Sequence, residues 1–346
     1  MRQAKQERMV GMFLTEPGVV VQRELPIPVP RPGEVLVQLR ATGVCGSDVH
    51  YFRDGRIGRY VVREPLILGH ETAGDVAAVG EGVTALRVGD RVALEPGIPC
   101  LQCAPCREGR YNLCESVSFM ATPPVHGAFV EYVVHPAAFA FPLPDDVTYA
   151  EGAMAEPLAV GLQCISRLGD VLGCSVLVAG AGTIGQMAVL AARAAGAASV
   201  TVVDPVPYRL QVAREMGACE AVAPCDLDAG RLFDVSIEAS GSQAAASLVM
   251  GQTRRGGRIV LVGLSTEGDV CIPVGSIVDN ETDVLGVFRY ANQYAKAIRL
   301  MASGVVKTLP LIGETFALRD VGAALAAADE HRDRCVKVLV LNSGKA

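Results

Sequence analysis

Four of the eleven cysteines lie within a short segment of this 346-residue chain. They follow the spacing C-x2-C-x2-C-x7-C and are Cys100, Cys103, Cys106 and Cys114. Four thiolates complete a tetrahedral shell around zinc and leave no coordination position open, which is typical of a structural site. An iron–sulfur cluster is the alternative, but the ferredoxin run has its fourth cysteine after three residues and a proline next, whereas Glu115 follows here. The spacing therefore predicts a structural zinc in a lobe at about 96–116.

A second set of metal-binding side chains lies upstream. Cys45 stands in GVCGSDVH, and His70 and Glu71 stand together in GHE. Taken singly, Cys45 is typical of a buried thiol and His70 of a hydrogen-bonded polar residue. Together they can supply a thiolate, an imidazole and a carboxylate and leave one position open for substrate. The pattern predicts a second zinc, with a catalytic role.

A glycine-rich motif, GAGTIG, fits the dinucleotide fingerprint G-x-G-x-x-G with Gly180, Gly182 and Gly185. It follows an expected strand and opens an expected helix, the context that supports this interpretation. Asp204 ends the next strand, where a carboxylate accepts hydrogen bonds from the ribose of NAD and repels the phosphate of NADP. Arg209 is a basic neighbour that can pair with Asp204. The alternative is a glycine-rich turn followed by a helix-capping aspartate.

The elements around these motifs change character along the chain. Val-rich strands separated by Pro and Gly are expected in the first 150 residues, at 35–39, 72–79 and 128–134. After Pro157, strands are expected to alternate with helices, at 176–179, 183–195, 199–204, 208–216, 233–238, 258–263 and 284–288. Two helices at 292–302 and 321–328 and a strand at 335–341 are expected to follow. This alternation predicts a parallel sheet covered on both faces.

Composition excludes several classes of protein. Half of the residues are hydrophobic and 20% are charged, so the chain can bury two cores and is not disordered. A net charge of −6 argues against a nucleic-acid partner. The charge-free run 171–192 is interrupted by glycines, which argues against membrane insertion. The start, MRQAKQERMV, has no apolar signal core, and an odd cysteine count does not indicate a disulfide framework, so a cytoplasmic location is expected.

The motifs GVCGSDVHYFRDGRIG, LGHETAG, the four-cysteine lobe, AEPLAVG, GAGTIG and GVFRY occur in this order. In these motifs, and over essentially its whole length, the chain resembles the zinc-dependent medium-chain alcohol dehydrogenases, and among them the sorbitol/xylitol (polyol) dehydrogenase branch. The resemblance implies an α/β protein, with a GroES-like β domain and a Rossmann domain built on a doubly wound parallel sheet. The implied bounds are 1–157 for the GroES-like catalytic domain and 158–290 for the NAD-binding domain. Residues 291–346 would then return to the catalytic domain and complete it. It also implies a homotetramer.

The resemblance implies roles for the metal ligands and their neighbours. Cys45 and His70 bind the catalytic zinc, and Glu71 is a ligand or a close carboxylate. Glu156, in AEPLAVG, stands where alcohol dehydrogenases place a second cysteine, and it either touches zinc or holds it through a water. A proton relay runs from Ser47 to His50, with Glu156 and a water as the competing route. The alternatives are a turn hydroxyl for Ser47 and a solvated loop residue for His50.

The resemblance also assigns a substrate pocket and the cofactor contacts. The substrate residues are Tyr51, Phe119, Arg289 and Tyr290. The cofactor residues are Gly180, Gly182, Thr183, Ile184, Gly185, Asp204, Arg209, Val262, Val287, Phe288 and Arg289. For Arg289 the alternative is a surface residue at a strand end. The expected function is NAD-dependent oxidation of a secondary hydroxyl of a polyol to a ketose. A zinc-dependent threonine dehydrogenase and a non-catalytic NAD- or zinc-binding protein are the alternatives.

Overall fold

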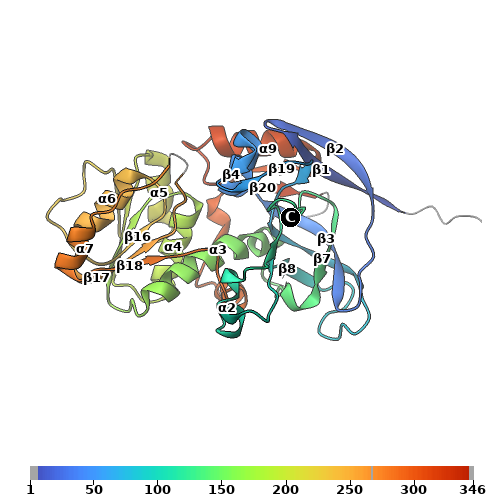
Figure 1. Cartoon of the computed structure of the whole chain (residues 1–346), viewed down its shortest axis with the longest axis horizontal. Helices are drawn as coiled ribbons and strands as arrows, with labels where there is room; N and C mark the ends of the chain where they lie inside the picture. The colour runs from blue at the N-terminus through green and yellow to red at the C-terminus, as the bar shows by residue number, and fades with distance from the viewer. Residues whose placement is uncertain (1–6, 266–267, 343–346) are drawn as a thin grey trace, which may run out of the picture. The chain divides into compact units, whose positions relative to one another are not determined.

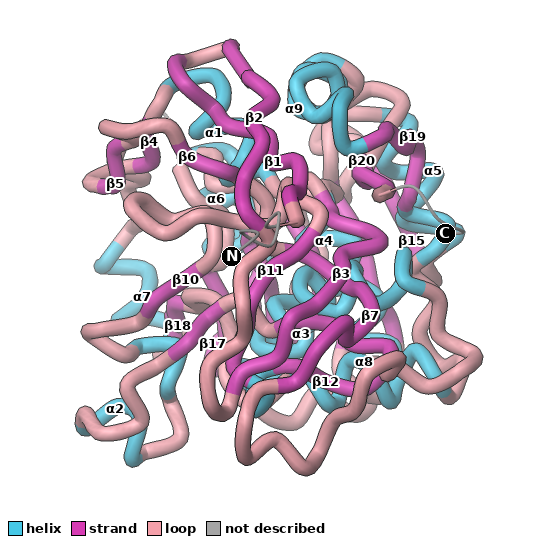
Figure 2. Tube along the Cα trace, turned by 90° about the vertical axis from the view of Figure 1, so that its right-hand side faces the viewer, coloured by secondary structure: helices cyan, strands magenta, loops and turns pink. Residues whose placement is uncertain are grey.

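Strand β3 (Glu34–Gly43) is the centre of the sheet that carries the metal-ligand motifs. In this computed structural model, which describes residues 7–265 and 268–342, β3 pairs with its neighbours antiparallel. The strand order is β12-β8-β7-β3-β20-β19, and β11 also pairs with β3. Strands β3 and β7 lie side by side in Figure 2. The other strands of this sheet are β7 (Glu71–Val79), β8 (Arg91–Leu94), β11 (Tyr132–Pro136), β12 (Ala140–Pro142), β19 (Ile312–Ala317) and β20 (Lys337–Leu341).

Smaller elements surround this sheet within the same compact unit. Strands β1 (Arg8–Glu16), β2 (Val19–Pro26) and β6 (Leu66–Ile67) form a second sheet. Two further two-stranded sheets pair β4 (Arg56–Ile57) with β5 (Tyr60–Val61) and β9 (Gly97–Ile98) with β10 (Ser118–Phe119). The helices are α1 (Gly46–Asp54), α2 (Ala104–Arg107), α9 (Val321–Glu330) and the 3-10 turns η1 (Tyr111–Leu113), η2 (Ala137–Phe139) and η4 (Leu318–Asp320).

A parallel sheet forms the second compact unit, in the order β15-β14-β13-β16-β17-β18. Its strands are β13 (Ser175–Ala179), β14 (Ser199–Val203), β15 (Glu220–Val222), β16 (Phe233–Glu238), β17 (Thr253–Leu261) and β18 (Asp283–Gly286). The helices that follow the strands are α4 (Thr183–Ala194), α5 (Pro207–Glu215), α6 (Gln243–Gln252), α7 (Val274–Asn280) and α8 (Tyr294–Ala302), with the 3-10 turn η3 (Leu309–Leu311) (Figure 1). The predicted alternation of strands and helices is confirmed.

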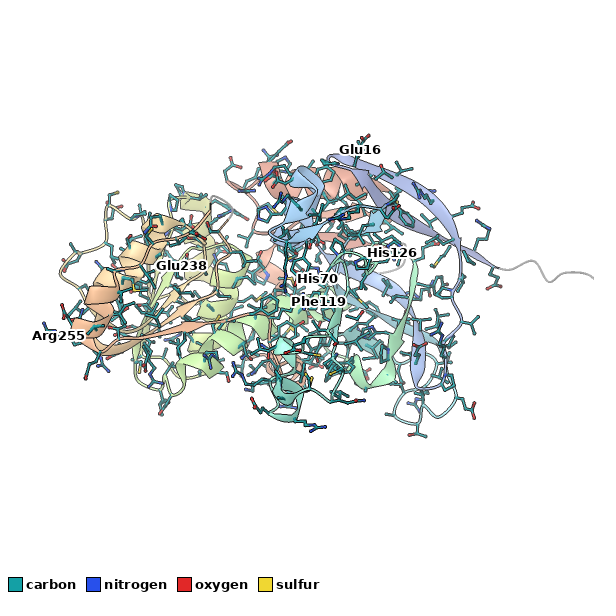
Figure 3. All side chains as sticks on the ribbon, in the orientation of Figure 1. Glu16, His70, Phe119, His126, Glu238 and Arg255 are labelled. Atoms are coloured by element: carbon teal, nitrogen blue, oxygen red, sulfur yellow. The ribbon has the colours of Figure 1, made fainter. Side chains whose placement is uncertain are left out.

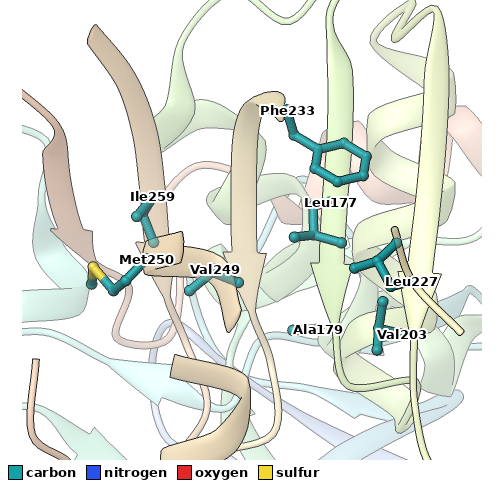
Figure 4. Close-up of a cluster of buried hydrophobic side chains, with 8 residues drawn as sticks. All are labelled: Leu177, Ala179, Val203, Leu227, Phe233, Val249, Met250 and Ile259. Carbon is teal, nitrogen blue, oxygen red and sulfur yellow. The ribbon is translucent and has the colours of Figure 1, made fainter. Parts of the chain in front are cut away.

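The core of this sheet is apolar on both the strands and the covering helix α6. Leu177, Phe233 and Ile259 project from three neighbouring strands and pack with Val249 and Met250 of α6 (Figure 4). Phe233 and Leu177 are completely buried. Continuous apolar strands of this kind are typical of a parallel sheet that helices cover, and they fix the strand ends where a cofactor binds.

Helix α3 (Tyr149–Leu168) contains the first boundary between the two units, at Glu156 and Pro157. The first unit resumes at Ile312, whereas the sequence analysis places the return at residue 291. Residues 291–311 stay with the second unit because the side chain of Gln163, on α3, accepts hydrogen bonds from the Ala291 amide and the Gln293 side chain, each at 3.3 Å. In the described part of the chain, no helix has the length and apolarity needed to cross a membrane.

Candidate active site

Cys45 lies at the N-terminal cap of α1, directly after β3. Its backbone amide donates a hydrogen bond to Asp48 Oδ2 at 3.0 Å, and the other oxygen of Asp48 accepts one from the Gly69 amide at 2.9 Å. Asp48 is completely buried. This carboxylate therefore ties the start of α1 to the segment that carries His70, and the sequence analysis assigned no role to it although it lies in the GVCGSDVH motif.

His70 and Glu71 lie at the start of β7 and point toward Cys45. The ligand atoms of Cys45, His70 and Glu71 all lie within 4.8 Å of one another. The Nδ1 atom of His70 is 3.8 Å from Asp48 Oδ1, and its ring packs against Phe119 at a centroid distance of 5.5 Å (Figure 3). Burial lowers the pKa of His70, but the charges of Cys45 and Asp48 outweigh burial and raise it well above its usual range. The surroundings of His70 thus favour a cation.

This geometry fits a catalytic zinc. Zinc bonds of 2.0–2.3 Å in a tetrahedral shell place neighbouring ligand atoms about 3.3–3.8 Å apart. The ligand atoms here all lie within 4.8 Å of one another, so one ion can reach all three after small side-chain shifts. A thiolate, an imidazole and a carboxylate leave a fourth position for substrate. Glu156 is buried but is not a member of this group, so the structure favours Glu71 over Glu156 as the third ligand.

Glu71 forms an ion pair with Lys337 of β20, and both side chains are about 1% exposed. The Lys337 ammonium also donates to the carbonyl oxygen of Val44 at 2.8 Å. Burial lowers the pKa of Lys337, but the charges of Glu71, Cys45 and Glu156 raise it above its usual value. No role for Lys337 was predicted from the sequence. Its signal was a single lysine inside the apolar run CVKVLVL, which no nearby motif explained.

The four lobe cysteines converge as the spacing predicts, with their sulfur atoms within 4.8 Å of one another. Backbone amides point at these sulfurs: Cys103 N donates to Cys100 Sγ at 3.3 Å and Cys100 N to Cys114 Sγ at 3.2 Å. The amide donors Gln102 and Cys103 lower the pKa of Cys100 to about 6. Amide donors of this kind favour thiolates, and a set of four fits a structural zinc.

A buried carboxylate links the lobe to the main sheet. Glu95, at the end of β8, accepts a hydrogen bond from the Tyr111 hydroxyl of the lobe at 2.7 Å. Burial raises the pKa of Glu95 to about 7, the Tyr111 hydrogen bond opposes this, and the charge of Glu156 adds to it. The lobe leads into β10, where Phe119 pairs with Gly97 of β9 and reaches His70. The lobe therefore holds one wall of the metal site.

Three predicted residues lie on α1. Tyr51 is buried, whereas Ser47 and His50 are half-buried. His50 Nδ1 lies 3.4 Å from an Arg53 nitrogen and 3.8 Å from Asp54 Oδ2. Burial and the Arg53 charge lower the pKa of His50, which keeps its ring neutral near pH 7. In the described ranges, no hydrogen bond joins the Ser47 hydroxyl to His50, so the structure brings the two onto one helix without linking them.

The glycine motif forms a tight turn between β13 and α4. Gly180 has φ +101°, and a Cβ on Gly185 would lie 1.8 Å from the Gly180 carbonyl oxygen, so the strand and helix approach as closely as the motif predicts. Gly182 caps α4, and Thr183 and Ile184 form its first turn. A Cβ on Gly182 would meet no atom within 4 Å. The turn therefore presents helix amides to open space, as a pyrophosphate site requires.

Asp204 lies after β14 and is buried. Its Oδ2 accepts from the Ala181 amide at 2.7 Å and its Oδ1 from the Val206 amide at 2.8 Å, while an Arg209 nitrogen is 4.0 Å from Oδ2. Val206, not Asp204, caps the helix α5. The carboxylate thus braces the glycine turn and still has lone pairs for a ribose.

The remaining cofactor and substrate residues follow the last two strands of the parallel sheet. The Val262 amide donates to Glu238 O at 2.9 Å and the Val287 amide to Leu261 O at 3.0 Å. Arg289 has φ +54°, and its guanidinium lies 4.7 Å from the centroid of the Phe288 ring. Tyr290 is buried against Tyr294. Arg289 and Tyr290 thus belong to the second unit, whereas Tyr51 and Phe119 belong to the first.

Two family models match the chain. Residues 31–145 match the alcohol dehydrogenase GroES-like domain, and residues 183–303 match the zinc-binding dehydrogenase domain. The first match covers most of the antiparallel sheet with its metal-ligand motifs, and the second covers the parallel sheet from helix α4 to helix α8.

Curated relatives match more than nine-tenths of the chain. The sorbitol dehydrogenase of Bacillus subtilis (strain 168) is 44% identical over 325 residues, which is 91% of this chain and 92% of that protein. A putative D-xylulose reductase of Rhizobium meliloti (strain 1021) is 43% identical over 95% of this chain and 98% of its own. Among solved structures, an Escherichia coli CFT073 protein named a short chain alcohol dehydrogenase, in complex with NADH, has a TM-score of 0.90 at 30% identity and covers 96% of this chain and 99% of its own.

Proposed function

The chain belongs to the zinc-dependent alcohol dehydrogenase family, and from this premise we propose that it oxidises a secondary hydroxyl of a polyol, such as sorbitol or xylitol, to a ketose. The hydride goes to NAD. The observation that carries the proposal is the convergence of Cys45, His70 and Glu71, which leaves a fourth metal position for a substrate hydroxyl. Identity of 42–44% to sorbitol dehydrogenases over 91–92% of the chain supports the substrate class.

Zinc bound here supplies a Lewis acid that lowers the pKa of a coordinated hydroxyl, and NAD supplies the hydride acceptor. Cys45 and His70 hold that metal, Asp48 orients both of them, and Glu71 completes the protein ligands. Phe119 covers the His70 ring and excludes water from that side of the site. Glu156 is buried close enough for its charge to act on Lys337. It would hold a water beside the metal rather than bind the metal itself.

The proton released from the substrate needs an acceptor. Ser47 follows Cys45 by two positions, and His50 lies one turn further along α1. A neutral His50, as its lowered pKa predicts, can accept the proton that Ser47 relays. Glu156 and its water form the competing route. The two routes differ in their test, since His50→Ala changes the pH dependence of kcat only in the first.

In the second unit, the amides at the start of α4 bind the pyrophosphate of NAD, and Asp204 accepts from the adenosine ribose hydroxyls. Arg289 can donate several hydrogen bonds to neighbouring hydroxyls of a polyol. These assignments distinguish a polyol from a simple alcohol, because only a polyol offers further hydroxyls to a guanidinium.

The experiment is a substrate panel on the purified full-length protein. Sorbitol, xylitol, galactitol, threonine and a simple secondary alcohol are compared with NAD and with NADP, with and without a zinc chelator. We expect NADH formation from at least one polyol at a kcat/KM well above that for threonine, and loss of this activity with the chelator. Higher activity on threonine, or polyol oxidation that the chelator leaves unchanged, would contradict the proposal.

We further propose a homotetramer in the cytoplasm. All eleven cysteines are free thiols in the structure, which suits a reducing compartment. Light scattering on a size-exclusion column tests the assembly, since a tetramer of 36.2 kDa chains has a mass about four times that value. A monomer or dimer across the micromolar range would rule the tetramer out.

A further inference from the structure

Lys337 is a completely buried lysine at the first position of the last strand, β20. Its ammonium donates to the carbonyl oxygen of Val44 at 2.8 Å and forms an ion pair with the carboxylate of Glu71. A lysine is almost never fully buried unless it is paired. Its partner here is the third member of the metal-ligand group.

Lys337 and Glu71 do not lie on neighbouring strands. The strand order is β7-β3-β20, so β3 separates them. On β3, Gly43 is in register with Glu71 on one side and with Leu339 on the other. Leu339 follows Lys337 by two positions and therefore shares its face of the sheet. The lysine side chain thus reaches Glu71 by crossing the central strand at Gly43.

Gly43 is what leaves room for this crossing. A Cβ at position 43 would lie 2.0 Å from Glu71 Oε2 and 3.0 Å from Lys337 Cε. Any side chain at this position would displace the carboxylate, the lysine or both. The backbone of β3 and the ammonium of Lys337 together confine the Glu71 carboxylate to its place beside Cys45 and His70.

The charges favour the same arrangement. Asp48, Glu71 and Glu156 are three buried carboxylates in this part of the unit, and the Lys337 ammonium contacts one of them directly. Without the lysine, the excess of buried negative charge would be larger by one, which is costly in a dry interior.

We propose that Lys337 is a positioning residue for the catalytic metal: across Gly43, its ammonium holds the Glu71 carboxylate in the orientation that binds the cation. This inference rests on the proposed function, because it takes Cys45 and His70 as metal ligands. It differs from a purely structural ion pair, which would stabilise the strands without affecting metal retention. Outer-shell partners of metal ligands typically change metal affinity by about 10–100-fold.

The experiment measures zinc release from full-length protein into a colorimetric chelator. The wild type is expected to release two zinc ions per chain in two phases. Lys337→Met should accelerate release from the Cys45 site by about 10–100-fold and leave the lobe zinc in place, which also reports that the variant has folded. Gly43→Ala should act in the same direction through displacement of Glu71. Gly46→Ala is the matched control, since a Cβ there meets no atom within 4 Å, and it should release zinc at the wild-type rate.

A double-mutant cycle with Glu71→Gln separates positioning from packing. Glu71→Gln removes the charge that the lysine holds, so Lys337→Met should add less than about a twofold change in that background. If Lys337→Met alone fails to fold, the double variant with Glu71→Gln removes the carboxylate charge that is left unpaired. Gly43→Ala then still tests whether the contact of Lys337 with Glu71 across β3 affects zinc release. In Co²⁺-substituted protein, the thiolate charge-transfer band of the Cys45 site should shift in Lys337→Met and in Gly43→Ala.

Two results would overturn the proposal. One is a folded Lys337→Met variant whose lobe zinc is retained and whose other zinc leaves at the wild-type rate. The other is that Lys337→Met accelerates zinc release by the same factor in the wild type and in the Glu71→Gln background. Wild-type protein that holds zinc only in the lobe would overturn this inference and the metal assignment together. Wild-type protein that holds two zinc ions but does not oxidise polyols would refute the proposed function. The zinc-release measurements would then still test the role of Lys337.

Discussion

Asp48 is a single side chain that fixes the ligands on both sides of it. It accepts from the Cys45 amide and from the Gly69 amide, and it faces His70 Nδ1. Carboxylates in this position orient metal-binding imidazoles and increase their basicity. The motif contained Asp48, yet the sequence could not predict its role, because its partner Gly69 lies 21 positions further along the chain.

At this scale Cys45 gives the most direct prediction for catalysis. Cys45→Ser should lower kcat for polyol oxidation by at least about 10³-fold, since Lewis-acid stabilisation is worth several kcal/mol and each 1.36 kcal/mol is a factor of ten. Steady-state NADH formation measures kcat, and metal analysis should find one zinc fewer with the lobe zinc retained. Cys225→Ser, at an exposed thiol, is the control. Wild-type turnover in Cys45→Ser would remove Cys45 from the site.

Asp204 predicts the choice of cofactor. Asp204→Asn keeps the shape of the side chain but removes its charge. A hydrogen bond to a charged group contributes about 1.5–3 kcal/mol, against about 0.5–1.5 kcal/mol for one between neutral groups. NAD binding should therefore weaken by roughly 10–100-fold, while NADP binding changes little or improves. Fluorescence titration of both cofactors measures the ratio. Equal weakening for NAD and NADP would show that Asp204 acts only by bracing the Ala181 amide.

At the scale of elements, sequence patterns located the parallel sheet well and the first unit less well. Strands β13, β14, β16, β17 and β18 and helices α4 and α5 follow hydrophobic runs with glycine stops, so their positions were predicted. The short strand β15 and helices α6 and α7 were not predicted. Helix α3 was not predicted, because Gly152 and Pro157 interrupt its pattern and a proline inside a helix removes a hydrogen bond. The strand expected at 128–134 begins at Tyr132 instead, since Ala128 and Phe129 bond to the Gly69 and Leu68 carbonyls outside the sheet.

The lobe predicts a stability effect that is separate from catalysis. Cys114→Ser should remove the structural zinc and a few kcal/mol of binding energy, which at about 2–4 °C per kcal/mol lowers Tm by roughly 5–10 °C. It should also lower activity, because the lobe leads into Phe119 beside His70. Calorimetry and metal analysis measure both effects, with the exposed Cys271→Ser as control. An unchanged Tm with full zinc content would mean that Cys114 is not a ligand.

Strand β11 contributes a pH-dependent term through His135. This ring is buried, its Nε2 lies 2.9 Å from Glu95 O, and burial lowers its pKa to about 4. Between about pH 6.5 and 4 the unfolded chain binds more protons at this histidine than the folded chain, so its contribution to stability is lost as pH falls. A shift of this size corresponds to about 3 kcal/mol.

His135→Gln cannot take up this proton and should therefore flatten the fall in Tm between pH 6.5 and 4.5. The pKa of Glu95, raised to about 7, makes stability increase as pH falls, which is opposite to the effect of His135. Because Glu95 is present in both proteins, Tm is compared between the wild type and the variant at each pH. The difference in Tm should shrink or reverse toward low pH. A constant difference across this range would show that His135 stays uncharged in the unfolded chain or ionises freely in the folded one.

At the scale of the whole molecule, the last strand completes a site that begins near the N-terminus. Lys337 and Val44 are 293 positions apart and share a hydrogen bond. The sequence analysis predicted that the C-terminal segment returns to the first unit, through the family resemblance alone. It could not predict which residue of that segment reaches Glu71, because no local pattern encodes the register of β20 on β3.

The most direct test of the account is a crystal structure of the full chain with an anomalous difference map at the zinc edge. The account predicts two peaks per chain. One should lie about 2.3 Å from Cys45 Sγ and 2.0–2.1 Å from a His70 nitrogen, and the other should lie among the four lobe sulfurs. A single peak in the lobe, with Cys45 and His70 turned away from each other in protein that still oxidises polyols, would contradict it.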